Sequence, residues 1–140
     1  MRLTPHGPGF SFIDAVEMLG ENPPRLRATK WLDPSLAFFE DHFPSNPLMP
    51  GVLLVEMAAQ AAGALWGRRE NLDASAMSFV LAQVQDFRLK RSARPGDTLL
   101  CEAQLQHEFG ALAQFAVEIG IRGEESPIAS GKITLARASG

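Results

Sequence analysis

The sequence from Gly51 to Trp66 reads GVLLVEMAAQAAGALW. Glu56 and Gln60 are its two strongly polar side chains, so a helix over this stretch is apolar almost all round. In a chain of 140 residues, such a helix is buried on most sides, which requires a sheet that curves around it and a second subunit as well. The glycine and the two cations of Gly67-Arg68-Arg69 are expected to end the helix.

The second half of the chain alternates apolar and polar residues with a period of two, which is typical of strands with one buried face. In the clearest case the apolar residues stand at every second position: Leu99, Cys101, Ala103 and Leu105. We expect four strands, over residues 79–89, 99–106, 114–122 and 132–135. Short turns between them favour an antiparallel sheet, and the helix is its obvious cover, which predicts an α+β fold.

The first half carries weaker signals. Phe12 to Leu19 has a helical pattern that Pro23-Pro24 would end, and Arg25 to Leu32 alternates weakly, as a strand would. Internal repeats and linkers long enough to separate domains are absent from the sequence. Residues 1–140 are therefore expected to form one domain.

Composition narrows the classes of partner. A formal net charge of −3 favours neither nucleic acid nor an anionic membrane surface. Glu56 interrupts the longest apolar segment, which argues against a membrane span, and the sequence starts without a secretory pattern, so we expect a cytoplasmic protein. Cys101 is the only cysteine and faces the apolar side of its strand, which indicates a core residue. We find no cofactor motif, and Asp41, His42 and Glu56 lack the compact spacing of a metal site.

The expected burial of Glu56 makes its carboxyl group a candidate proton donor. An unpaired carboxylate in apolar surroundings costs several kcal/mol, and such a group usually responds by holding a proton. A neutral glutamic acid can donate that proton, and the Gln60 amide, one turn further along the same face, is placed to orient it. The alternative is a structural Glu56 that is satisfied by a backbone group or by an arginine of a partner chain.

The segment before the helix carries His42 and prolines at positions 44, 47 and 50. Each proline fixes its own φ and pushes the residue before it towards extended geometry, so this loop is expected to be stiff. A stiff loop would hold His42 in a fixed relation to the helix start, as a general base requires. A surface histidine beside two acidic residues is the alternative.

The helix start adds a third element. A capping side chain is lacking close to Gly51, so the N–H groups near Gly51 and Val52 need a partner. A bound carbonyl oxygen would serve, because it gains hydrogen bonds and lies at the positive end of the helix dipole. Water is the alternative partner.

Together these residues resemble the signature of the FabZ-type 3-hydroxyacyl-acyl-carrier-protein dehydratases, which have the hot-dog fold. The matching residues are His42-Phe43-Pro44, then Pro47-x-Met49-Pro50-Gly51-Val52-Leu53, then Glu56 and Gln60. Further similar residues extend the resemblance over most of the chain: Phe12 with Val16, Phe38-Phe39, and Arg94-Pro95-Gly96-Asp97. The resemblance therefore implies a curved antiparallel sheet wrapped around the central helix.

The resemblance also implies a reaction. His42 would take a proton from Cα of a 3-hydroxyacyl thioester, and Glu56 would protonate the departing hydroxyl, so that water leaves and a trans-2-enoyl thioester forms. The Gly51 amide, with Val52 beside it, would polarise the thioester carbonyl, and Gln60 would orient Glu56. The substrate would arrive as a phosphopantetheine thioester on an acyl carrier protein. A homodimer or higher homo-oligomer would share its active sites, and a cofactor is not implied.

Three departures from the family pattern stand out. Ser45 stands where the family usually has Gly, and Asn46 stands where it often has His. Both positions are in the loop and are not among the predicted catalytic residues. The chain also lacks tyrosine, and Ser78, beside Phe79, occupies the position where the family often has an aromatic gate. Acyl chain length, and the choice between fatty-acid synthesis and a polyketide or polyene pathway, therefore stay open.

Four cations after the helix form a basic segment: Arg88, Lys90, Arg91 and Arg94. They are candidates for docking the acidic carrier protein, or they are a solvated strand end. Two rival functions also stay open, a hot-dog acyl thioesterase and a non-catalytic acyl-binding subunit. Paired His42 and Glu56 favour elimination over both, because a binding module has no use for a buried acid.

Overall fold

The computed structural model describes residues 13–35, 51–69 and 79–137. In chain order these residues form β1 (Ala15–Glu21), β2 (Pro24–Trp31), α2 (Gly51–Arg69), β3 (Phe79–Leu89), β4 (Thr98–Phe109), β5 (Leu112–Ile121) and β6 (Ala129–Arg137). The strands form one six-stranded sheet in the order β1-β2-β4-β5-β6-β3, and all neighbours pair antiparallel. Within the described part of the chain, β1 and β3 are thus the two edges.

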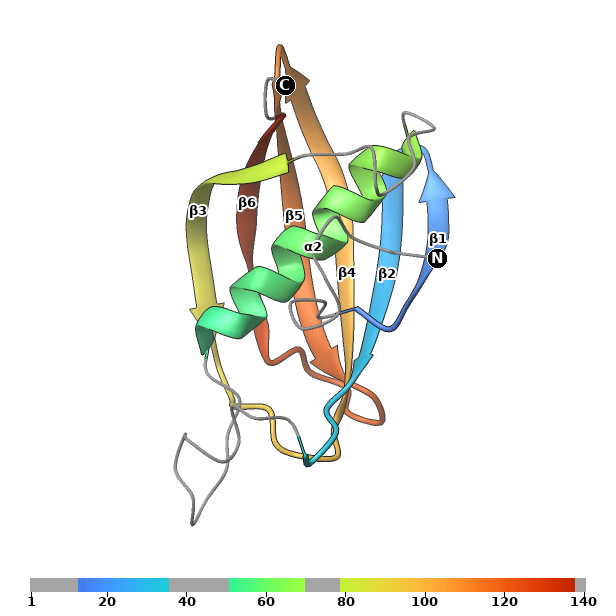
Figure 1. The fold of residues 1–140 in the computed structure, drawn as a ribbon, viewed down its shortest axis with the longest axis vertical. Helices are drawn as coiled ribbons and strands as arrows, with labels where there is room; N and C mark the ends of the chain where they lie inside the picture. The colour runs from blue at the N-terminus through green and yellow to red at the C-terminus, as the bar shows by residue number, and fades with distance from the viewer. Residues whose placement is uncertain (1–12, 36–50, 70–78, 138–140) are drawn as a thin grey trace.

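Helix α2 lies across one face of this sheet, and strand β3 bends around the side on which the helix begins (Figure 1). The helix contacts five of the strands, β2 to β6. Most of its apolar side chains are buried, although Val52 in the first turn is exposed, and Gln60 is the one buried polar side chain among its described residues. The predicted α+β, hot-dog arrangement of a curved antiparallel sheet around a central helix is confirmed.

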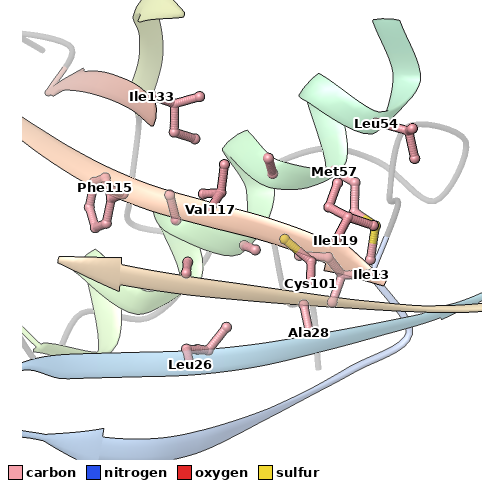
Figure 2. Close-up of a cluster of buried hydrophobic side chains, with 14 of the residues drawn as sticks. Ile13, Leu26, Ala28, Leu54, Met57, Cys101, Phe115, Val117, Ile119 and Ile133 are labelled. Atoms are coloured by element: carbon pink, nitrogen blue, oxygen red, sulfur yellow. The ribbon is translucent and has the colours of Figure 1, made fainter. Parts of the chain in front are cut away.

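The core fills the space between α2 and the inner face of the sheet. Figure 2 shows Met57 of the helix pointing towards Cys101 and Ile119 on β4 and β5. Trp66 and Phe115 are the largest of the fully buried side chains. Cys101 is a core residue as predicted, and burial raises the pKa of its thiol to about 12. Its thiol is therefore protonated near neutral pH and is a poor nucleophile.

The four strands expected after the helix are all present, and β3 has the predicted bounds. Strands β4 and β5 form a hairpin whose turn falls at Gly110, directly after Phe109, where the alternation breaks. Gly110 has a φ of 63°, which favours glycine because a Cβ is disfavoured there. The sheet is antiparallel as predicted, and β4, β5 and β6 are neighbours in chain order, but β3 pairs with β6 and not with β4.

The expected helix at Phe12 to Leu19 is wrong. From Ala15 onward this segment belongs to strand β1, which pairs with β2 from Ala15↔Thr29 to Glu21↔Pro24. Val16 and Met18 face Ala28 and Leu26 in that register. The backbone bonds to β2 outweigh a short helical pattern that has no partner surface of its own. Pro23-Pro24 therefore stands at the turn between two strands and does not end a helix.

Helix α2 ends at Arg69, within the predicted segment Gly67-Arg68-Arg69, but Gly67 is still helical and does not stop it. Trp66 donates from Nε1 to Glu108 Oε1 at 3.1 Å, and Arg69 pairs with Glu108 at 3.2 Å. These contacts to β4 hold the last turn in helical geometry, so Gly67 is not a stop. Arg68 and Arg69 do lie in the last turn, as predicted, where cations face the negative end of the dipole. Within the described residues, no helix is long and apolar enough to cross a membrane.

Candidate functional site

The start of α2 is the place where the sequence predicts an oxygen-binding site. The helix begins at Gly51, and its first turn contains no acidic side chain. The first N–H groups of a helix have no partner within that helix. A Cβ on Gly51 would come 3.3 Å from Leu89 Cδ2, so glycine lets β3 approach the helix start closely. The Val52 side chain, in the first turn of the helix, is 71% exposed.

The expected contact between Glu56 and Gln60 is present. Gln60 donates from Nε2 to Glu56 Oε1 at 3.1 Å, as the four-residue spacing on one helix face allows. Gln60 is 5% exposed, whereas Glu56 is half-buried and so less enclosed than the sequence suggested. The amide of the buried Gln60 therefore holds one oxygen of the half-buried Glu56 carboxyl group in place.

Several predicted site residues lie outside the described residues. His42, its proline-rich loop and Ser78 belong to the ranges 36–50 and 70–78, so their roles stay predictions. The four others, Gly51, Val52, Glu56 and Gln60, all lie on the first half of α2. Val52, Glu56 and Gln60 follow one another at intervals of four residues and so share one face of the helix.

The basic segment is exposed at the end of β3 and in the loop that follows, but its members differ in their contacts. Arg91 forms an ion pair with Glu124 and donates to the Ser126 carbonyl oxygen at 2.9 Å. These contacts tie the loop to the segment between β5 and β6. Arg88 and Lys90 are exposed and enter no ion pair with any residue the structure describes.

One cluster at the far end of α2 was not predicted. Trp66 is fully buried and stacks on Phe79, with 4.8 Å between ring centroids and 11° between the planes. Arg137 lies 5.0 Å above the Trp66 ring, and Glu108 accepts the indole N–H. A buried tryptophan generally needs an acceptor, but the sequence does not indicate that the acceptor is Glu108 on a strand 42 residues away.

The fold and this helix define the class of the protein. It is a hot-dog protein whose central helix carries a carboxyl–amide pair, Glu56 and Gln60, in its first half. The FabA-like domain family matches residues 4–125, which is most of the chain. The chain belongs to this family.

Named relatives agree with that assignment. The 3-hydroxyacyl-acyl-carrier-protein dehydratase FabZ of Xanthomonas oryzae is 33% identical over 136 residues, which cover 97% of this chain and 88% of that protein. FabZ of Thermus thermophilus is 34% identical over 139 residues, 99% of this chain and 96% of that protein. The dehydratase heterocomplex ApeI:P from Xenorhabdus doucetiae superimposes with a TM-score of 0.76 at 19% identity, over 99% of this chain and 90% of that one. The last likeness supports the fold alone.

Proposed function

We propose that this chain dehydrates 3-hydroxyacyl thioesters on an acyl carrier protein to trans-2-enoyl thioesters, in fatty-acid or related polyketide or polyene synthesis. The observation that carries the proposal is the Gln60 to Glu56 hydrogen bond on the central helix of a FabA-like domain. Its relatives from Xanthomonas oryzae and Thermus thermophilus are named as dehydratases of this kind and match nearly the full chain. The same residues, 1–140, are proposed to form one hot-dog domain, and a cytoplasmic location stays a prediction.

The roles follow from the chemistry of elimination. His42 is proposed to remove a proton from Cα, and Glu56 to give a proton to the departing 3-hydroxyl, so that one water molecule leaves. Negative charge that develops on the thioester oxygen would be stabilised by the N–H groups of Gly51 and Val52 at the positive end of α2. Gln60 is a positioning residue, because it touches Glu56 and fixes one of its oxygens.

Products distinguish the proposed reaction from its rivals. A dehydratase converts 3-hydroxyacyl carrier into an enoyl thioester that absorbs in the ultraviolet. A thioesterase releases a free acid and the carrier thiol, and a binding subunit changes neither. Purified protein is expected to give the enoyl thioester with no rise in free thiol. Free acid, or no product at all, would overturn the proposal, since the fold alone suits all three functions.

The basic segment is proposed to dock the carrier protein through Arg88 and Lys90. Arg91 is already engaged by Glu124, so it contributes less. Reversing both charges, with Arg88→Glu and Lys90→Glu, is expected to raise KM for the carrier-bound substrate about 10-fold and to leave a short soluble thioester surrogate unaffected, because opposite potentials mainly speed encounter. Steady-state kinetics with both substrates checks this expectation.

A charge-matched control separates docking from net charge. Arg25→Glu with Arg68→Glu makes the same change on exposed residues away from the end of β3, since Arg25 pairs with Gln104 on β4 and Arg68 lies in the last turn of α2. This control is expected to leave KM for the carrier-bound substrate within about 2-fold of the original. Equal effects of the reversal on both substrates would rule out docking.

Strand β3 is proposed as the contact between two copies of the chain. It is an edge strand, all of whose residues are exposed or half-buried, and Val80 is 52% exposed on it. An edge with exposed apolar residues is a template for pairing with another strand. The opposite edge, β1, carries Glu17 and Glu21 and has an irregular register after Met18, features that disfavour such pairing. A homodimer with shared sites is the proposed assembly.

Mass in solution tests the homodimer. The chain of 15.2 kDa is expected to show the mass of at least two copies by light scattering, and Val80→Glu is expected to shift it towards one copy, because a charged side chain on an edge strand disfavours pairing with another strand. Phe109→Glu is the matched control, since Phe109 is equally exposed at 52% but lies beside the β4–β5 turn. A single-chain mass for the unaltered protein would contradict the homodimer.

A further inference from the structure

Two close contacts join α2 to β3, one towards each end of the helix. A Cβ on Gly51 would lie 3.3 Å from Leu89 Cδ2, and a Cβ on Gly63 would lie 3.3 Å from Phe79 Cδ2. Leu89 is the last residue of β3 and Phe79 is the first. Helix and strand therefore meet at both ends of β3, and at each meeting the helix presents a glycine.

Between these contacts, the inner face of β3 is apolar and uncovered. Leu81 pairs with Leu135 and Val84 with Ile133, so both side chains point to the face of the sheet that carries the helix. Leu81 and Val84 are each 40% exposed, although their partners on β6 are buried. We call the side chains of Leu81 and Val84 the β3 strip. Pairing of the β3 backbone edge with a second chain does not use this inner face.

The carboxyl group of the proposed acid lies on the helix beside this region. Glu56 and Gly63 are seven residues apart, which puts them on the same side of the helix. At 1.5 Å per residue, the contact of Gly63 with Phe79 lies about 10 Å beyond Glu56 along the helix axis. An acyl chain that extends from Glu56 along the β3 strip therefore reaches Phe79.

Phe79 is held firmly where it meets the helix. Its ring stacks on Trp66, and Gly63 leaves the space that the Phe79 edge occupies. Trp66 is fixed in turn by the Glu108 carboxylate, by an edge contact with Phe115 at 6.1 Å between centroids, and by Arg137 above its ring. A change of the Phe79 rotamer would lose the stacking interaction with Trp66. The Phe79 ring is therefore a rigid wall.

We propose that Phe79, stacked on Trp66, is the far wall of the acyl site and sets an upper limit on the length of the acyl chain. This inference rests on the proposed dehydratase function. It assigns short- and medium-chain 3-hydroxyacyl thioesters as the substrate class and gives Phe79 the role of a specificity-determining residue. The β3 strip supplies the apolar surface along which such a chain lies.

The test compares kcat/KM for short-, medium- and long-chain 3-hydroxyacyl thioesters on one carrier protein. For the unaltered enzyme, kcat/KM is expected to decrease steeply between medium-chain and long-chain substrates. Phe79→Ala is expected to raise the ratio of long-chain to short-chain kcat/KM about 10-fold, because removing a wall admits further methylene groups. Phe79→Leu, which keeps more of the packing, is expected to shift the ratio in the same direction by less. Phe109→Ala removes an aromatic ring away from the helix contact and is expected to leave the ratio unchanged.

The outcomes separate this inference from the function on which it rests. If the unaltered protein dehydrates no chain length, the proposed function fails. Two results would contradict the role of Phe79 and leave the proposed dehydratase function in place. One is that the unaltered protein dehydrates long chains as well as medium ones. The other is that both Phe79 variants are folded, as thermal unfolding shows, and keep its preference for chain length. A merely structural Phe79 would lower kcat/KM for all lengths alike and leave the ratio in place.

Discussion

Replacing Glu56 by Gln is expected to lower kcat for dehydration about 10²-fold or more, because an amide cannot protonate the departing hydroxyl group. The change keeps the size of the side chain and an oxygen that accepts the bond from Gln60 Nε2, which spans 3.1 Å in the unaltered protein. The helix on which the residue lies is packed through other positions, among them Leu54 and Met57. The effect should therefore fall on the chemical step and not on the fold.

Single-turnover kinetics with a saturating amount of enzyme measures this step directly, and thermal unfolding verifies that the variant is folded. Glu118→Gln is the control, since Glu118 is exposed on β5 and its backbone pairs with Glu102 and Ser130. It is expected to keep full activity. A Glu56→Gln enzyme within a few-fold of the original would mean that the proton comes from another group.

Gly131→Ala is expected to destabilise the folded protein by about 3 kcal/mol, the upper end of what overpacking in a core costs. A Cβ at this position would lie 2.7 Å from the Cα of Phe87, closer than real contacts allow. Phe87 follows Asp86, whose φ of 53° is unusual for a residue other than glycine, in an irregular stretch of β3. Because the atom in the way belongs to the backbone, a change of side-chain rotamer cannot relieve the contact.

Urea unfolding at one fixed protein concentration measures this difference, since the stability of an oligomer depends on concentration. Gly120→Ala is the matched control, because a Cβ on Gly120 meets nothing within 4 Å and its strand is also paired on both sides. It is expected to be neutral or slightly stabilising, as loss of glycine restricts the unfolded chain. Equal stability of the two variants would show that β3 moves away from β6 at little cost.

Much of this fold could be predicted because its signals are local. The alternation around Cys101 predicted β4, and the apolar run after Gly51 predicted a helix that the sheet must cover. The segment at Phe12 to Leu19 could not be predicted in the same way. Its structure depends on pairing with β2, and a short pattern of apolar residues does not reveal that pairing.

The candidate site also has a part that the sequence predicts and a part that it does not. The contact between Glu56 and Gln60 follows from helix geometry alone, and it was confirmed. The stack of Phe79 on Trp66 could not be foreseen, since it joins a strand to a helix and its geometry depends on the whole core. The partial exposure of Glu56 likewise depends on how far the sheet curves around α2, which its sequence leaves open.

The proposed reaction removes water from a 3-hydroxyacyl thioester while the thioester stays intact. Intact-mass spectrometry of a 3-hydroxyacyl carrier protein, before and after incubation with the purified chain, tests it most directly. We predict that the carrier loses the mass of one water molecule, keeps its acyl group, and remains unchanged when His42→Ala replaces the active protein. A carrier that loses its acyl group, or that keeps its full mass with the unaltered chain, would contradict the account.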